Sequence, residues 1–260
     1  MIDIHTHILP NIDDGSSHED ITSYYLDRLN EAGIEGVVFT PHYYRGIFHN
    51  TKDKILLKYD KVLEMIKKKG YKFNTYCSAE VYLMGSEVMT DIQDNAFMIN
   101  GSRYVLVENS LFGFSFDMYE NLYKLSRLGF KPILAHPERY QELLTKPDLS
   151  EDFMYRDVYF QINTGSILGE YGNNVRDLAL KLIDKGHAHF LGSDCHCTNG
   201  EYNYLKAVEY IRREFGDKTA DILSYEHPLK MINNENIPHF YLKNKAKPVK
   251  KNLLQRLFRL

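Results

Sequence analysis

The chain has 260 residues and a formal net charge of −3, with 43% hydrophobic and 26% charged residues. These values are ordinary for a soluble globular protein, and the charge gives no overall attraction to nucleic acid. Three cysteines, no signal-like start and no run of about 18 apolar residues argue against a disulfide-stapled secreted fold, a signal peptide and a membrane span. We therefore expect a reduced, cytoplasmic protein of one main domain.

Short apolar runs, several of them β-branched or aromatic, alternate with helical patterns along the chain. The predicted strands are Met1–His5, Gly36–Thr40, Lys72–Ala79, Tyr104–Glu108, Pro132–His136, Val158–Asn163 and His189–Asp194. Strands that alternate with helices form a parallel sheet, and at this length the pattern predicts an α/β barrel.

The helical patterns between these strands mostly end at a glycine. A capping box formed by Ser16 and Glu19 is predicted to begin the first helix. Because glycine favours the left-handed C-cap conformation, five helices are predicted to end before a glycine. These residues are Gly33, Gly70, Gly129, Gly186 and Gly216.

Residue types that bind metals recur at or just after the predicted strand ends. They are His5, His7, His42, Glu80, Glu108, His136, Asn163, Asp194 and His196. The C-terminal ends of parallel strands share one rim of a barrel, so these side chains can meet there. His5 and His7 are two residues apart on an extended segment, so both rings leave the same face.

The carboxylates among these residues favour a metal site over isolated ion pairs. Glu80 and Glu108 each close an apolar strand, where a carboxylate is costly unless it is paired or coordinated. Six to nine such ligands exceed the needs of one ion and imply two or three. Imidazole mixed with carboxylate suits Mn²⁺, Fe or Zn²⁺.

Three further positions qualify this prediction. Asp13 and Asp14 lie in a turn before the first helix, and one of them is expected to serve only the turn. Pro41 cannot continue a central ladder, which predicts His42 in a rim loop. Cys195 and Cys197 lack a second cysteine pair and are expected to be structural.

Several of these motifs together resemble a known superfamily. They are His5-Thr6-His7, Asp13-Asp14-Gly15, Thr40-Pro41-His42, Glu80, Glu108, His136-Pro137-Glu138-Arg139-Tyr140 and Asp194-Cys195-His196. Over roughly residues 1–235 the chain is similar to the PHP (polymerase and histidinol phosphatase) superfamily, and within it to bacterial manganese-dependent protein-tyrosine phosphatases of capsule and exopolysaccharide operons.

The resemblance implies a distorted seven-stranded (β/α) barrel with a trinuclear centre, most readily of manganese. The implied metal ligands are His5, His7, Asp14, His42, Glu80, Glu108, His136, Asp194 and His196. It also implies that Arg139 binds phosphate and that Arg139, His42 and Asp194 take part in catalysis. Relatives usually have a second arginine shortly after the Asp194 motif, which this chain lacks, so Arg45 is a candidate replacement.

The expected reaction is phosphoester hydrolysis by direct attack of a metal-bridging hydroxide on phosphorus. A cysteine-based mechanism is excluded because the sixth residue after each cysteine is not an arginine: it is Leu83, Glu201 or Asn203. The expected substrate is a phosphotyrosine protein, such as a bacterial tyrosine kinase of capsule synthesis. The alternatives are a histidinol-phosphate phosphatase and a non-catalytic regulator that binds a kinase tail.

The last segment differs in composition from the rest of the chain. Residues 243–260 contain seven basic residues and no acidic one, with leucines at helical spacing. We divide the chain into a PHP-type phosphatase domain, residues 1–240, and a basic amphipathic extension, residues 241–260. The extension is a candidate for peripheral membrane or partner contact, and the alternative is a solvated terminal segment.

Overall fold

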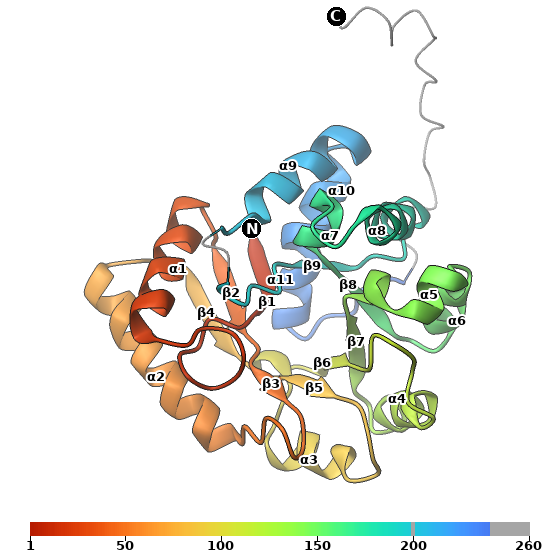
Figure 1. Cartoon of the computed structure of the whole chain (residues 1–260), viewed down its shortest axis with the longest axis horizontal. Helices are drawn as coiled ribbons and strands as arrows, with labels where there is room; N and C mark the ends of the chain where they lie inside the picture. The colour runs from red at the N-terminus through yellow and green to blue at the C-terminus, as the bar shows by residue number, and fades with distance from the viewer. Residues whose placement is uncertain (199–200, 240–260) are drawn as a thin grey trace, which may run out of the picture.

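The computed structural model describes residues 1–198 and 201–239 (Figure 1). Its strands are β1 (Ile2–Thr6), β2 (Gly36–Phe39), β3 (His42–Tyr43), β4 (Asn74–Cys77), β5 (Glu80–Tyr82), β6 (Tyr104–Glu108), β7 (Lys131–Ala135), β8 (Tyr159–Asn163) and β9 (Phe190–Gly192). Its α-helices are α1 (Glu19–Glu31), α2 (Lys52–Lys69), α3 (Val88–Asp94), α4 (Met118–Arg127), α5 (Gln141–Thr145), α6 (Leu149–Tyr155), α7 (Thr164–Leu168), α8 (Asn173–Lys185), α9 (Tyr204–Phe215), α10 (Asp217–Asp221) and α11 (His227–Ile232). Shorter turns are η1 (Ile99–Gly101), η2 (Pro137–Arg139) and the π-helical η3 (Ile222–Glu226).

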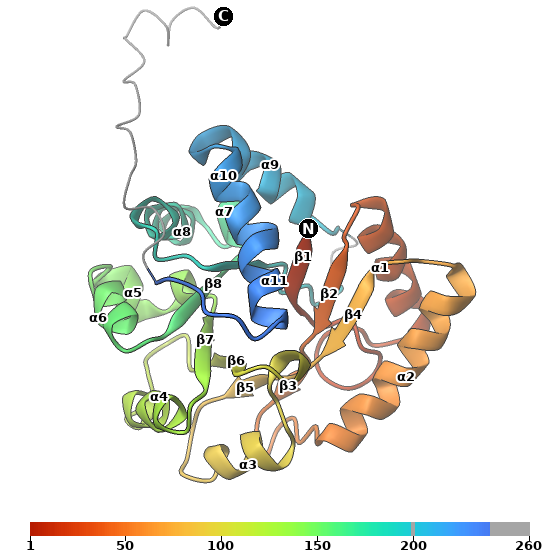
Figure 2. The ribbon, with the colours of Figure 1, turned by 180° about the vertical axis from the view of Figure 1, so that it is seen from behind.

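The strands form two parallel sheets, ordered β1-β2-β4 and β3-β5-β6-β7-β8-β9. The end strands of the two sheets are linked by a parallel bridge between Thr6 and Cys195 and by the N–H of Asp194, which donates to the His5 carbonyl at 2.9 Å. The result is a curled sheet with most helices on its outside, as the two opposite views show (Figures 1 and 2).

The predicted count of seven strands is not confirmed. Each of the seven predicted segments contains one strand, but two further short strands, β3 and β5, follow just after the predicted segments Gly36–Thr40 and Lys72–Ala79, so the described residues hold nine strands. Glu80 begins β5, so the prediction that it closes an apolar strand is wrong. Pro41 has no N–H and ends β2. His42 then begins the short strand β3, where it pairs with Glu80 of β5, so the prediction that His42 lies in a loop is wrong.

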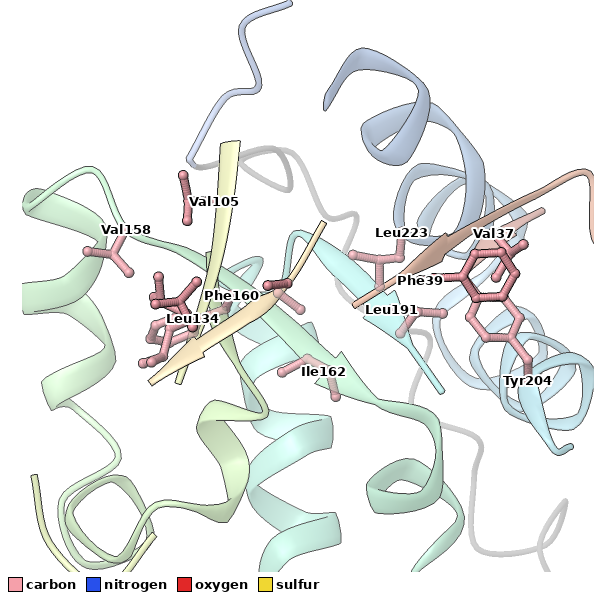
Figure 3. Packing of buried hydrophobic residues seen from close by; sticks show 14 of the residues in the cluster. Val37, Phe39, Val105, Leu134, Val158, Phe160, Ile162, Leu191, Tyr204 and Leu223 are labelled. Carbon is pink, nitrogen blue, oxygen red and sulfur yellow. The ribbon is translucent and has the colours of Figure 1, made fainter. Parts of the chain in front are cut away.

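Alternate residues of the strands belong to two hydrophobic clusters, as expected when successive side chains point to opposite faces. Val37 and Phe39 lie in the larger cluster, which helices cover, whereas Val38 between them lies in the smaller one. Figure 3 shows part of the larger cluster, which contains strand residues such as Leu134 and Leu191 as well as Tyr204 and Leu223. Met231 of α11 packs in the smaller cluster.

The helix ends agree with the glycine pattern but not with the capping box. All five predicted glycines have positive φ, between 68° at Gly33 and 88° at Gly216. Helix α1 has His18 at its N-cap without a side-chain cap, because the Ser16 hydroxyl donates instead to the His18 carbonyl.

The predicted boundary at residue 240 and the basic extension 241–260 lie outside the described residues. Among the residues that the structure describes, no helix combines the length and the hydrophobicity that crossing a bilayer requires.

Candidate metal centre

The predicted ligand residues converge at the C-terminal ends of the strands. Eight of the nine fall into three overlapping groups, and within each group the ligand atoms lie within 4.8 Å of one another. The groups are His5, His7, Glu80 and Asp194; His7, Asp14, His42 and His196; and His42, Glu80 and Glu108. The ninth, His136, places Nε2 3.1 Å from Glu80 Oε1.

The innermost group is fully enclosed. The Nε2 atoms of His5 and His7 lie 3.0 Å apart, as their two-residue spacing predicts. Glu80 Oε2 lies 3.1 Å from His5 Nε2 and 3.3 Å from His7 Nε2. Asp194 Oδ1 lies 3.4 Å from each of the same two nitrogens. Two imidazoles and two carboxylates therefore face one small space.

The other two groups extend this space toward solvent. Nδ1 of His42 lies 3.1 Å from Glu80 Oε2 and 3.0 Å from Glu108 Oε1, while its Nε2 lies 3.4 Å from Asp14 Oδ1. Asp14 is the most open of these side chains, with 56% of its surface exposed, and Nε2 of His196 lies 3.5 Å from it. The centre is thus buried at Glu80 and open at Asp14.

Two buried carboxylate oxygens at the centre fit a bound cation. Glu80 Oε2 and Asp194 Oδ1 have no hydrogen-bond partner within the described residues, although both carboxylates are almost completely buried. A buried carboxylate is costly unless it is paired or coordinated, and here either protonated imidazoles or a bound cation would balance its charge. Imidazole nitrogens and carboxylate oxygens that converge in this way fit divalent metal ions such as Mn²⁺, Fe²⁺ or Zn²⁺.

The carboxylates also control the charge of the histidines. Burial and the neighbouring His7 lower the pKa of His42, but Glu80 and Glu108 outweigh them and raise it to about 10. A hydrogen bond from His196 is the main cause that lowers the pKa of Asp14 to about 2. The negative potential that favours protons here also favours a divalent cation, which competes with those protons.

Asp13 and Gln161 orient the candidate ligands, and sequence reasoning did not assign them this role. Asp13 Oδ2 lies 2.8 Å from His7 Nδ1 and accepts the His42 backbone N–H at 3.0 Å. Gln161 Oε1 lies 2.7 Å from His5 Nδ1. Contacts of this kind fix the tautomer of a metal-binding histidine. The available signal for Gln161 was its place two residues before Asn163, on the same face of β8.

Asn163 contacts the centre through Asp194 rather than as a member of a ligand group. Its amide nitrogen donates to Asp194 Oδ2 at 2.7 Å, and its Oδ1 accepts from Gln161 Nε2 at 2.8 Å. A continuous set of hydrogen bonds therefore connects His5 to Asp194 through Gln161 and Asn163.

Special backbone positions bring these groups together. His136 and Asp194 have left-handed φ values of 38° and 51°, which is uncommon for residues other than glycine and costs about 1–3 kcal/mol each. A Cβ on Gly15 would lie 2.0 Å from the His7 carbonyl oxygen. Only glycine therefore lets the Asp13–Gly15 turn approach His7 this closely.

A cavity of about 370 Å³ opens beside the centre. Its lining includes Asp14, Asp194 and His196, and Arg139 is its one lysine or arginine among the described residues. The Arg139 Nη1–H donates to Asp194 Oδ2 at 3.1 Å. Its sequence neighbour Glu138 is buried and instead accepts the Asn163 backbone N–H.

Arg45 does not line the cavity beside this centre. Its Nε and Nη2 donate to the two carboxylate oxygens of Asp91, at 3.0 and 2.6 Å. It lines a separate cavity of about 200 Å³, which contains none of the nine candidate ligands. The described contacts therefore give no support to Arg45 as the second phosphate-binding arginine.

A curled parallel sheet with imidazoles and carboxylates at its C-terminal rim is the arrangement of a metal-dependent α/β hydrolase. Comparison with known proteins narrows this class. The chain belongs to the capsular polysaccharide synthesis family CpsB/CapC, whose family model matches residues 1–233.

Individual relatives agree with this assignment. CapC of Staphylococcus aureus is 32% identical over 239 residues, which cover 91% of this chain and 93% of CapC. The tyrosine-protein phosphatase YwqE of Bacillus subtilis is 27% identical over 261 residues, covering 98% of each chain. One solved structure comes from work on B. subtilis YwqE and Streptococcus pneumoniae CpsB, described as unique metal-dependent tyrosine phosphatases. It has a TM-score of 0.85 and 26% identity, over 91% of this chain and 96% of that chain. The family resemblance drawn from the sequence is confirmed.

Proposed function

We propose that this chain is a metal-dependent protein-tyrosine phosphatase. The observation that carries the proposal is the buried set of imidazoles and unpartnered carboxylate oxygens beside a cavity that contains Arg139. Family membership supports the activity and its connection with capsular polysaccharide synthesis.

The candidate ligands named above would hold two or three divalent ions, for which we propose Mn²⁺ first, with Fe or Zn²⁺ as alternatives. Bound ions would supply a water molecule activated at neutral pH and positive charge for the phosphoryl oxygens. The side chains of Glu80 and Asp194, ionised and buried, would keep His5 and His7 in place for this purpose.

Arg139 would bind the phosphoryl group from the cavity side. Its side chain is 24% exposed, and Asp194 binds one of its nitrogens, so other N–H groups remain for phosphate oxygens. Asp194 contacts both the histidines and Arg139, and therefore aligns the guanidinium with the ion sites. His42, with 14% exposure, lies between the buried and the open groups.

Three finer parts of the proposal extend beyond the described site. The protein substrate would be a tyrosine kinase of capsule or exopolysaccharide synthesis, and the enzyme would act in the cytoplasm. The basic extension 241–260 would contact an anionic membrane surface or the kinase. Truncation after Tyr241 should then weaken binding to anionic vesicles in a salt-dependent way, with hydrolysis of a small aryl phosphate unchanged.

The deciding experiment measures metal content and two substrates together. Protein purified without chelator should contain two to three equivalents of transition metal by elemental analysis. With added Mn²⁺ it should hydrolyse a phosphotyrosine peptide much faster than histidinol phosphate, and excess chelator should abolish the activity. Preference for histidinol phosphate would support the second candidate from the sequence, and binding without turnover would support a non-catalytic regulator.

A further inference from the structure

Arg139 is held by an aromatic ring as well as by a carboxylate. Its Cζ lies 4.4 Å from the centroid of the Tyr171 ring, while its Nη1 donates to Asp194 Oδ2 at 3.1 Å. Tyr171 lines the same cavity and is 40% exposed. A cation over the face of an aromatic ring leaves the N–H groups at its edge free for other partners.

We propose that Tyr171 is a positioning residue, whose ring holds the Arg139 guanidinium ready to bind the phosphoryl group of the substrate. The inference rests on the proposed phosphatase function. A free arginine side chain loses rotamer freedom when it binds a phosphate, and this loss weakens binding. Tyr171 and Asp194 together restrict that freedom before the substrate arrives.

Glycines near Tyr171 in the sequence allow its ring to take this position. Tyr171 follows α7 in a short connection between Gly169 and Gly172, which both have left-handed φ values, 91° and 92°. Gly165 of α7 lies directly beneath it: a Cβ on Gly165 would be 3.2 Å from Tyr171 Cε2 and 2.5 Å from Glu170 Oε2. The Glu170 N–H also donates to the Gly165 carbonyl at 2.9 Å. The missing side chain of Gly165 thus allows the ring its position.

The cavity makes this support important. Arg139 is its one lysine or arginine among the described lining residues, and Asp14 and Asp194 contribute negative charge there. Among the described lining residues, Arg139 therefore supplies the guanidinium that a phosphoryl group entering this cavity would meet, besides the proposed ions. Any disorder of Arg139 therefore affects substrate binding directly.

The test compares Tyr171→Leu with Tyr171→Phe in the full-length, Mn²⁺-loaded protein. Tyr171→Leu removes the aromatic face and should lower kcat/KM on a phosphotyrosine peptide about 3- to 30-fold, mainly through KM. Tyr171→Phe keeps the face and should retain near-wild-type values. Tyr24→Leu is a matched control, because Tyr24 is 42% exposed and lies under Arg28 at 4.9 Å, on α1.

A double-mutant cycle identifies the route of the effect. If Tyr171 acts through Arg139, Tyr171→Leu should cause no further loss in an Arg139→Ala background. Equal losses in both backgrounds, or failure of phenylalanine to restore kcat/KM, would overturn the positioning role. Gly165→Ala, which should displace the ring without removing it, provides a second variant with the expected direction of Tyr171→Leu.

Calorimetric binding of inorganic phosphate separates this inference from the proposed function. The wild-type protein could bind phosphate without hydrolysing phosphotyrosine, and the proposed function alone would then fail. In that case Tyr171→Leu should still weaken phosphate binding about 3- to 30-fold, with metal content unchanged. Unchanged phosphate affinity in Tyr171→Leu would refute the inference whether or not the protein is a phosphatase.

Discussion

Strand β9 runs between two groups of histidines. His42 of the group near its C-terminal end favours the protonated form, whereas His189 and His227 near its N-terminal end favour the neutral form. After its C-terminal end lies the metal centre, where Glu80 and Glu108 overcome the effects of burial and of His7 and raise the pKa of His42 to about 10. Before its N-terminal end lies His189, packed near His227 and His239. There burial lowers the pKa of His227 to about 4 and holds that of His189 well below its ordinary value.

The difference comes from the neighbours of the histidines. Both groups are enclosed by protein, but the centre has several carboxylates within 3.5 Å of imidazole nitrogens, such as Glu80 beside His5 at 3.1 Å. Near the start of β9, Asp157 makes such a contact, with His239 at 3.2 Å. A cation fits the first group, whereas the second is a neutral packing layer. A histidine count alone does not locate a metal site.

Removal of the Glu80 charge should have the largest effect on the contrast between the two histidine groups, because it takes a carboxylate away from the metal centre. Glu80 belongs to two of the three ligand groups. Glu80→Gln should therefore lower kcat/KM on a phosphotyrosine peptide on the order of 10³-fold, since bound metal supplies several kcal/mol of transition-state stabilisation. In chelator-treated protein the pKa of His42, followed by NMR, should fall. Glu120→Gln, an exposed change on α4, is the control, and normal activity of Glu80→Gln would exclude Glu80 as a ligand.

Arg139 tests whether the open side of the centre binds phosphate. Arg139→Lys keeps the charge but loses the planar pair of donors. A charge-assisted contact contributes about 1.5–3 kcal/mol, so kcat/KM should fall about 10- to 200-fold while metal content stays normal. Near-wild-type kcat/KM for Arg139→Lys would make the arginine a structural partner of Asp194.

Substitution of Asp13 tests whether this carboxylate orients the candidate ligands His7 and His42. Asp13→Asn should weaken Mn²⁺ binding about 10- to 100-fold, because the carboxylate fixes the ring of His7 and the backbone of His42. Titration of metal-free protein measures this directly, with the exposed Asp20→Asn as control. An unchanged affinity would show that Asp13 serves only the turn.

The metal-binding rim could be predicted from the sequence because it follows from local patterns, the polar residues at the ends of apolar strands. Glu108 and His136 end apolar strands, and parallel strands share a rim whatever the remaining structure is. Helix-ending glycines such as Gly70 followed from the same kind of local rule.

Contacts between distant residues could not be predicted in this way. Gln161 and His5 are 156 positions apart in sequence, and Arg139 meets Asp194 across 55 positions. The separate strand that begins at Glu80 had no sequence signal, since Glu80 reads as the end of the preceding apolar run Lys72–Ala79. In the same way, His189 and His42 are the same residue type, and only the folded arrangement shows which of them has carboxylates nearby.

The smallest expected effect is a loss of stability at acidic pH, caused by the histidines that are neutral in the folded protein. Because the pKa of His227 falls from about 6.5 in the unfolded chain to about 4 in the folded one, the unfolded chain binds more protons in this range, and stability falls as pH drops from 6.5 toward 4. At pH 5 the loss from this residue is about 2 kcal/mol. Histidines with raised pKa, such as His42, are largely protonated in both states below pH 6.5, so their contribution to stability changes little with pH there.

Urea unfolding of metal-free protein between about pH 7.5 and pH 5 measures this loss. His227→Asn should keep a donor to the His189 carbonyl, which the Nδ1 of His227 contacts at 3.0 Å, and should flatten the pH dependence by about 2 kcal/mol. His18→Asn, at a site 70% exposed before α1, should leave it unchanged. An equally steep pH dependence in His227→Asn would mean that the pKa of His227 is the same in the folded protein as in the unfolded chain, and the contrast between the two ends of β9 would not extend to this residue.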